Sequence, residues 1–193
     1  MTGRPHEVVL VRHGETEWSR TGRHTGRTDV PLTDAGREQA RATASRLAGR
    51  SFERVLTSPL QRAAETCRLA GLGGSAETVD DLREWDYGEY EGRTTPEIRK
   101  EVEDWTVWAG PLPGGESVAD VGARADRVLE SLRGVEGDVA LVAHGHMLRV
   151  LGARWVGLPP EGGRMLALST AALCVLGWER ETRVLRSWNE SGT

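Results

Sequence analysis

The sequence is poor in cysteine and contains no long hydrophobic stretch. Its two cysteines, Cys67 and Cys174, lie far apart, with no CxxC spacing and no neighbouring Cys/His cluster. We therefore interpret both as small core residues in a reducing compartment, and not as metal ligands or a disulfide framework. The apolar run at residues 8–11 is far too short for a signal peptide, and nothing approaches the roughly 20 apolar residues of a membrane span. We expect a soluble protein of the cytoplasm.

The sequence also lacks a strong net charge. Its 25 basic and 29 acidic residues give a net charge of −4 and a pI near 5.8. No overall field favours nucleic acid or an anionic membrane, so we expect neither as a partner, and any anion must be held by a local cluster. Lys100 is the only lysine among the basic residues. We attribute this bias to base composition, although the rigid guanidinium fork suits phosphate better than an ammonium group does.

The pattern of short strands and helices predicts the fold class. No internal repeat appears, and 193 residues suit one domain with a single core. Short β-branched runs that end at polar or glycine residues predict three buried strands, Glu7–Val11, Arg54–Thr57 and Asp138–Ala143. Each run is followed by a helical pattern. The alternation predicts an α/β fold of three layers, α/β/α, with a mostly parallel sheet that has helices on both faces.

Local signals locate the helices. The run Ser58-Pro59-Leu60-Gln61 has the form of a capping box with proline at the first helical position, so a helix should begin there. A helix near Ser117 is indicated by apolar residues that recur on one stripe. Two further helices complete the set, one from Thr33 to about Ala48 and one over Gly145–Trp155.

Two further segments extend this core. The apolar segments Ala172–Trp178 and Arg183–Trp188, separated by four polar residues, predict an antiparallel hairpin at the sheet edge. The segment of about residues 82–116 is rich in tryptophan and tyrosine, and we interpret it as a small helical cap over one end of the sheet. Loops rich in glycine and proline punctuate the sheet without dividing the chain into separate domains.

Polar residues follow each predicted strand. Arg12 and His13 follow the first strand, Arg62 lies shortly after the second, and His144 and His146 follow the third. Because ligands bind at the carboxyl ends of parallel strands, we expect these side chains to gather at one edge. Guanidinium groups and a helix N-terminus form a strong site for a phosphate dianion, and their charge keeps a nearby imidazole neutral. Such an imidazole can attack phosphorus without a metal ion, because phosphoryl transfer depends mainly on alignment and charge neutralisation.

Other interpretations of these residues stay open. His144 and His146 have the spacing of a partial metal site, but no third histidine or carboxylate lies at ligand spacing beside them, so we expect neither a metal nor a cofactor. His6 and His24 are interpreted as surface or loop residues. The aromatic residues of the cap are more typical of a core than of a ligand platform.

The chain resembles the histidine phosphatase superfamily in its phosphoglycerate-mutase-like branch. Five blocks carry the resemblance, in the order that the family has them, from about residue 7 to residue 150: VRHGETEW (11–18), TGRTDVPLT (25–33), TSPLQRAAET (57–66), LREWDYGEYEG (82–92) and VAHGH (142–146). The run from Arg83 to Gly92 is similar to members described as sugar-bisphosphatase-like. The resemblance implies a metal-independent phosphatase that forms a phosphohistidine.

The resemblance also implies a role for each catalytic residue. His13 would be the nucleophile, and Arg12, Arg62 and His144 would hold the phosphoryl group and stabilise its transition state. Glu84 would be the general acid that protonates the leaving alcohol.

Further residues would bind substrate. The resemblance implies that Thr25, Gly26 and the backbone of Gly145 contact it and that Tyr87 lines the pocket mouth. Many members have asparagine where this chain has Ser19, whose hydroxyl can still donate a hydrogen bond to phosphate, although with a shorter reach.

The resemblance leaves a mutase as the alternative. Mutases of this branch have an insertion, with basic residues for the phosphoglycerate carboxylate, between the acid and the second histidine. Here that interval, from Glu84 to His144, has few basic residues, and three of them, Arg124, Arg127 and Arg133, are expected to be solvated on an amphipathic helix. We therefore predict a phosphatase, in which water takes the phosphoryl group. A non-catalytic module that binds a phosphorylated ligand is the third hypothesis.

The sequence narrows the substrate only to a small phosphorylated metabolite. A sugar phosphate is favoured by the resemblance, and a nucleotide is the other candidate, with Trp85 or Trp105 as a stacking partner. The oligomeric state is open, because the C-terminal hairpin can either form the edge of a homodimer or be covered within one chain.

Overall fold

The core of the protein is a six-stranded sheet in the order β3-β2-β4-β1-β5-β6. The computed structural model describes residues 6–192. Four neighbouring strands are parallel, namely β3 (Ala76–Thr78), β2 (Arg54–Thr57), β4 (Val139–Ala143) and β1 (Val8–Arg12). The hairpin of β5 (Leu173–Glu179) and β6 (Thr182–Glu190) joins β1 in antiparallel orientation. The predicted α/β class, the three buried strands and the edge hairpin are therefore confirmed.

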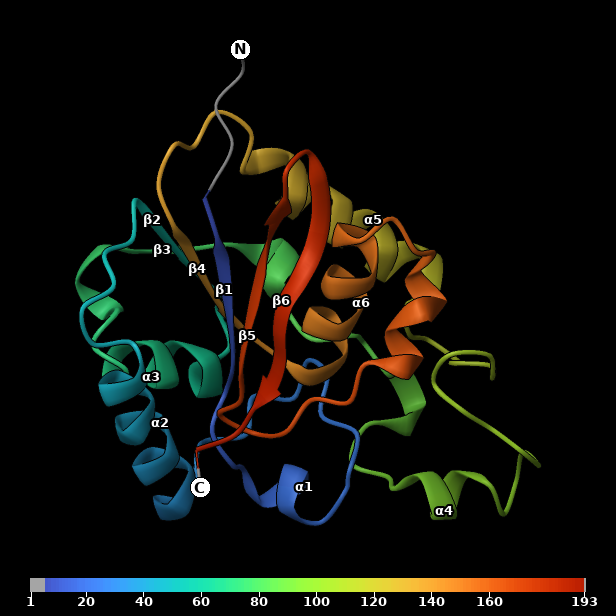
Figure 1. Ribbon diagram of the computed structural model, residues 1–193. Coiled ribbons are helices and arrows are strands. Elements are labelled where there is room, and N and C mark those ends of the chain that lie inside the picture. The colour runs from blue at the N-terminus through green and yellow to red at the C-terminus, as the bar shows by residue number, and fades with distance from the viewer. Residues whose placement is uncertain (1–5, 193) are drawn as a thin grey trace.

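Helices cover both faces of this sheet. Figure 1 shows α2 (Asp34–Arg46) and α3 (Gln61–Leu69) on one side of the strands and α5 (Val118–Ser131) and α6 (Gly145–Trp155) on the other. Successive side chains of β1 point to opposite faces. Accordingly Val8 and Leu10 pack into one hydrophobic cluster and Val9 and Val11 into the other. An uninterrupted apolar run is what a strand buried on both faces requires.

The short strand β3 was not predicted. It has three residues, follows the one-turn 3-10 helix η1 (Gly73–Ser75), and its side chains are half-buried or exposed. So short and polar a segment shows no alternation of apolar and polar residues from which a strand could be predicted. It pairs with β2 because β2 would otherwise present an open edge on that side.

The predicted capping box of α3 is wrong. The helix begins at Gln61, after Leu60, which makes no side-chain cap. Ser58 directly follows β2 and is still bonded to β4, since its backbone N–H donates to Val142 O at 3.0 Å. Its hydroxyl oxygen lies 2.7 Å from Nε2 of His144, and the backbone N–H of Gln61 donates to Asp29 Oδ1 at 2.9 Å. The Ser58 hydroxyl and the backbone N–H groups of Ser58 and Gln61, which the capping box would use locally, are therefore bonded to residues from distant segments.

The segment of residues 82–116 lies beyond one end of the sheet, near α1 (Glu17–Arg20) (Figure 1). Its regular structure is one short helix, α4 (Thr95–Ile98), and the turn η3 (Gly88–Tyr90), which follows η2 (Asp80–Leu82). Buried indole rings organise the rest. Trp85 Nε1 donates to Glu116 O at 2.8 Å and Trp105 Nε1 to Pro111 O at 2.9 Å. The interpretation as core is confirmed for Trp85, Tyr90 and Trp105, whereas the buried Tyr87 also lines a cavity.

The remaining elements agree with the sequence. Cys67 and Cys174 are buried and free, and burial raises the pKa of each thiol to about 11. A last 3-10 segment, η4 (Pro160–Met165), packs against α6. Among residues 6–192, no helix combines the length and the hydrophobicity that crossing a bilayer demands.

Candidate active site

Three neighbouring strands deliver the predicted catalytic residues to one edge of the sheet. Because β1 lies beside β4 and β4 beside β2, the residues that follow these strands are close in space. His13 follows β1 and His144 follows β4, and their ring centres are 5.2 Å apart. The gathering that the strand ends predicted is therefore present.

His13 is held as a neutral imidazole. The residue is only 4% exposed, and its Nδ1 lies 2.7 Å from Gly14 O. A carbonyl oxygen can only accept, so Nδ1 carries the proton and Nε2 keeps its lone pair. Burial, followed by the charges of Arg12 and Arg62, holds the pKa of His13 well below its usual range. The ring is thus unprotonated at Nε2 near neutrality.

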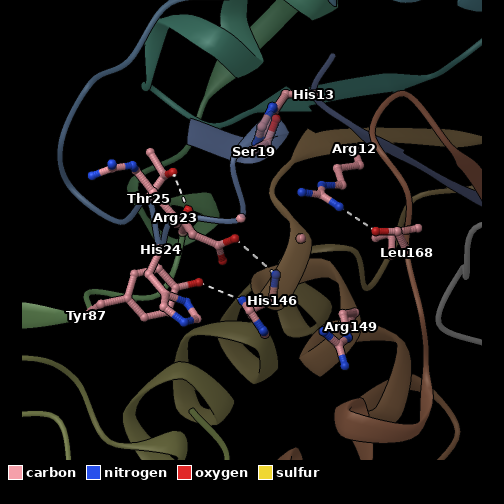
Figure 2. A pocket seen from close by; sticks show the side chains of 13 residues that line it. Arg12, His13, Ser19, Arg23, His24, Thr25, Tyr87, His146, Arg149 and Leu168 are labelled. Carbon is pink, nitrogen blue, oxygen red and sulfur yellow. Dashed lines mark hydrogen bonds between the residues drawn. The ribbon is translucent and has the colours of Figure 1, made fainter. Parts of the chain in front are cut away.

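Arg12 lies beside His13 in the same cavity (Figure 2). One terminal nitrogen donates to Leu168 O, whereas its Nε is buried without a hydrogen-bond partner among the described residues. A buried donor left unpaired is costly. Gly145 gives this guanidinium its room, because a Cβ there would lie 3.3 Å from Arg12 Cζ. An anion in the cavity would supply the missing acceptor.

Arg62 and His144 lie behind the cavity and do not line it. Arg62 is fully buried, and its terminal nitrogens donate to the carbonyls of Thr25, Gly26 and Thr28 at 2.9–3.1 Å. Its Nε donates to His144 Nδ1 at 3.2 Å. Burial and Arg62 lower the pKa of His144 well below the ordinary value, so the ring is neutral. Because Nδ1 accepts from Arg62, the single proton of the ring sits on Nε2. These two residues support the loop of residues 25–28 as well as the site.

Ser58 completes this buried network. The Nε2–H of His144 donates to Ser58 Oγ at 2.7 Å, and Ser58 is fully buried. Sequence reasoning missed this role because the serine matched a capping signal. The strand end that precedes it was the available clue, since residues at that position face the site.

Glu84 lines the cavity from the loop after η2. Its carboxylate accepts hydrogen bonds from three backbone N–H groups, those of Trp85 at 2.9 Å, His146 at 3.0 Å and Met147 at 2.9 Å. Two of these donors belong to the first turn of α6, whose orphan N–H groups favour an acidic partner. The side chain is therefore fixed in the lining of the cavity, beside the start of α6.

The predicted substrate-binding residues divide into two groups. Ser19, Thr25, Tyr87 and Gly145 line the cavity, and Gly26 does not. Gly26 is buried outside the cavity, where a Cβ would lie 2.2 Å from a carboxylate oxygen of Glu91. Because glycine has no Cβ, the backbone of Gly26 can approach Glu91 and Trp85 closely.

The hydroxyl of Ser19 is already engaged. It donates to Thr16 O at 3.0 Å and accepts from Thr16 N at 2.9 Å, as the N3 member of the capping box of α1. The expected donation to phosphate therefore requires this cap to open.

His24 was expected on the surface or in a loop, and the surface interpretation is wrong. The residue lies in a loop, but it is half-buried and lines the cavity. Its Nε2 lies 3.2 Å from Thr95 Oγ1, and its ring packs against Tyr87 and Trp105 with centre separations of 4.9 and 5.2 Å. Burial lowers its pKa to about 4. No local signal marks it, because cap residues far along the chain create its environment.

His146 lines the same cavity, next to His24 and Tyr87. Its Nδ1 lies 2.6 Å from the hydroxyl of Tyr87 (Figure 2). Burial, followed by Arg149 and His24, lowers the pKa of His146 well below the usual range, while burial and Glu84 raise that of Tyr87. The phenol is thus the donor and the imidazole the acceptor. Within residues 6–192, no group of three or more histidine, cysteine or acidic residues is arranged to hold a metal ion.

Arg149 is a further cavity residue that the sequence reasoning missed. It donates to the carbonyls of Gly163 and Arg164 at 3.1 and 3.2 Å, and its guanidinium lies 4.8 Å from the ring centre of Trp108. Helical spacing could have found it, because it lies one turn after Gly145 on α6.

The cavity itself is small, with a volume of about 180 Å³. Typical sites for drug-sized ligands measure about 300–1,000 Å³. Trp85 and Trp105, named above as stacking partners for a nucleotide base, are buried and do not line it, so that suggestion is wrong.

Comparison with known proteins defines the class. The family model for the histidine phosphatase superfamily (branch 1) matches residues 8–191. The chain is 45% identical to an acid phosphatase of Mycobacterium tuberculosis, over 94% of this chain and 91% of that protein. It is 35% identical to a sedoheptulose 1,7-bisphosphatase of Saccharomyces cerevisiae, over 78% of this chain and 67% of that protein. A probable phosphoglycerate mutase of Yersinia enterocolitica is 31% identical to the chain, over 94% of this chain and 89% of that protein.

Solved structures agree with this result. The structure of an open reading frame product of Mycobacterium tuberculosis superposes with a TM-score of 0.90 and 44% identity, covering 98% of this chain and 100% of that one. The chain belongs to the histidine phosphatase superfamily, branch 1. The predicted assignment to a histidine-phosphatase-type hydrolase is confirmed.

Proposed function

We propose that the protein hydrolyses a small phosphate monoester through a phosphohistidine at His13. The observation that carries the proposal is the neutral His13 ring beside the unpartnered Nε of Arg12, in one small cavity. An anion held by Arg12 would lie where Nε2 of His13 can reach its phosphorus. The guanidinium would neutralise the charge that spreads over the equatorial oxygens.

Two half-reactions complete the cycle. In the first, Nε2 attacks phosphorus while the bond to the leaving oxygen breaks, and Glu84 gives that oxygen its proton. In the second, water attacks the phosphohistidine, Glu84 takes the proton from the water, and the bond between phosphorus and nitrogen breaks. Phosphate leaves and both side chains return to their starting states.

The residues between Glu84 and His144 support a phosphatase in preference to a mutase. None of the basic residues in that interval lines the cavity. Arg93 and Arg127 pair with Glu101 and Asp81, and Arg99 donates to a backbone carbonyl. A second substrate would therefore find no cation from this interval, and water is the acceptor that remains.

The small cavity supports a compact substrate. Its polar lining, which includes Thr25 and Arg149, suits a phosphorylated sugar or a similar small metabolite. The names of the acid phosphatase and bisphosphatase relatives support the same class. The free cysteines support the reducing cytoplasm as its compartment.

An assay with two arms tests this proposal. The purified protein should release phosphate from nitrophenyl phosphate and from small sugar phosphates at the same rate with and without EDTA. Incubation with 3-phosphoglycerate and a bisphosphate primer should give phosphate faster than isomer. Loss of activity in EDTA would overturn the metal-free mechanism, and faster isomerisation would favour the mutase. Saturable phosphate binding without turnover of any ester would favour the non-catalytic module.

A further inference from the structure

The loop that carries Glu84 is held by a half-buried ion pair between Arg124 and Glu116. Arg124 was expected to be solvated on its helix, and that expectation is wrong, because its side chain is only 11% exposed and that of Glu116 is 23% exposed. The two side chains form a bidentate pair. Arg124 Nε and a terminal nitrogen each donate to a carboxylate oxygen at 2.8 Å. Such geometry is the strong form of an ion pair.

The remaining donors of Arg124 reach the backbone around Glu84. One terminal nitrogen donates to Asp81 O and Arg83 O, both at 2.8 Å, and the other approaches Glu84 O at 3.4 Å. All five N–H groups of the guanidinium are thus used. Three of the acceptors lie in the four residues from 81 to 84.

Glu116 holds the other side of the same loop. Its carboxylate accepts from Asp86 N at 3.0 Å, and its backbone N–H donates to Asp86 O at 2.9 Å. Its backbone carbonyl accepts from the indole of Trp85 at 2.8 Å. The pair therefore fixes the chain immediately before and immediately after Glu84.

We propose that Arg124 and Glu116 are positioning residues for Glu84, which they aim at the oxygen of the leaving group. Neither side chain lines the cavity, so both act through the loop. A general acid must lie within hydrogen-bond reach of the atom that it protonates. A displacement of about 1 Å can cost on the order of a hundredfold in rate. The inference rests on the acid role of Glu84 in the proposed function.

The consequence concerns the leaving group. An ester with a good leaving group, such as nitrophenyl phosphate, needs no proton from an acid, whereas a sugar phosphate does. Loss of the pair should therefore slow hydrolysis of sugar phosphates and spare nitrophenyl phosphate. A merely structural role would slow both esters alike.

Arg124→Met and Arg124→Lys test the proposal, with Arg127→Met as the control. Lysine keeps a charge for Glu116 but lacks the fork that reaches Asp81 O and Arg83 O. Arg127 lies on the same helix, is 58% exposed and pairs with Asp81. We expect Arg124→Met to lower kcat/KM for a sugar phosphate at least about tenfold and for nitrophenyl phosphate less than about threefold. Arg124→Lys should lie between this variant and the wild type, and Arg127→Met should match the wild type.

A double variant separates this inference from the function on which it rests. In a Glu84→Gln background, Arg124→Met should cause no further loss on the sugar phosphate. Equal losses on both esters, or a full additional loss in the Glu84→Gln background, would overturn the positioning role. If Glu84→Gln itself affects both esters alike, the acid assignment fails and the inference falls with it. Should Arg124→Met fail to fold, the ester ratio of Arg124→Lys decides.

Discussion

The floor and the outer wall of the cavity are built in different ways. The floor, formed by Arg12 and His13, comes directly from the end of β1 in the middle of the sheet. The wall, formed by His24, Tyr87 and His146, is held by contacts between a loop, the cap and α6. The sheet thus places the groups that we propose react with phosphate, whereas contacts between distant segments place the groups proposed to face the rest of the substrate. Changes in the floor should affect every ester, and changes in the wall should depend on the ester or on pH.

The largest effect is expected for His13→Ala. Without the nucleophile, kcat should fall at least about a thousandfold on nitrophenyl phosphate and sugar phosphates alike. His24→Gln, in the wall, should retain most activity on nitrophenyl phosphate. Steady-state kinetics of both variants measure the contrast. Similar losses from the two substitutions would break the distinction between floor and wall.

A selective effect is expected for Glu84→Gln. The amide keeps the shape of the side chain but cannot give a proton, so hydrolysis of sugar phosphates should fall about a hundredfold. Nitrophenyl phosphate should lose much less, because its leaving group departs unprotonated. The ratio of kcat/KM for the two esters is the measurement, and an unchanged ratio would refute the acid role.

A smaller effect on stability is expected for Gly26→Ala. The new Cβ would lie 2.2 Å from Glu91 Oε1 and 2.6 Å from Trp85 O, so the loop and the cap must separate. Overpacking of this kind costs about 1–3 kcal/mol of unfolding free energy. Gly74→Ala is the matched control, since its Cβ would meet no atom within 4 Å. Urea unfolding compares the two, and equal stabilities would show that the cap gives way freely.

An effect that depends on pH is expected from His24. Its pKa is about 4 in the folded chain against an ordinary value of 6.5. The unfolded chain therefore binds this proton first as pH falls, so stability is lost between about pH 6.5 and 4. His24→Gln should lose less stability over that interval than the wild type. Urea unfolding at several pH values tests this, and identical pH profiles would contradict the burial of His24.

Much of the floor could be predicted from the sequence. The strand runs are apolar on both faces, and the polar residues that end them must lie at the carboxyl edge. The hairpin and the start of α5 at Ser117 were equally clear, since each has its own local signal. These features depend on neighbours in the sequence.

The wall and its supports depend on distant partners. Ser58 matches a cap but bonds His144, and Arg124 matches a solvated face but bonds the loop of Glu84. In each case a partner from a distant segment replaces the local partner or solvent that the sequence pattern indicated. His24 owes its burial to Tyr87 and Trp105, more than 60 residues away, and no pattern near it reports that contact.

The most direct test of the account is to trap phosphate on the protein. A labelled ester that is mixed rapidly with the protein and quenched in alkali should leave label on Nε2 of His13, in a form that acid releases. His13→Ala should carry none. Turnover with no covalent phosphate during the first cycles, or label on a different residue, would contradict the account.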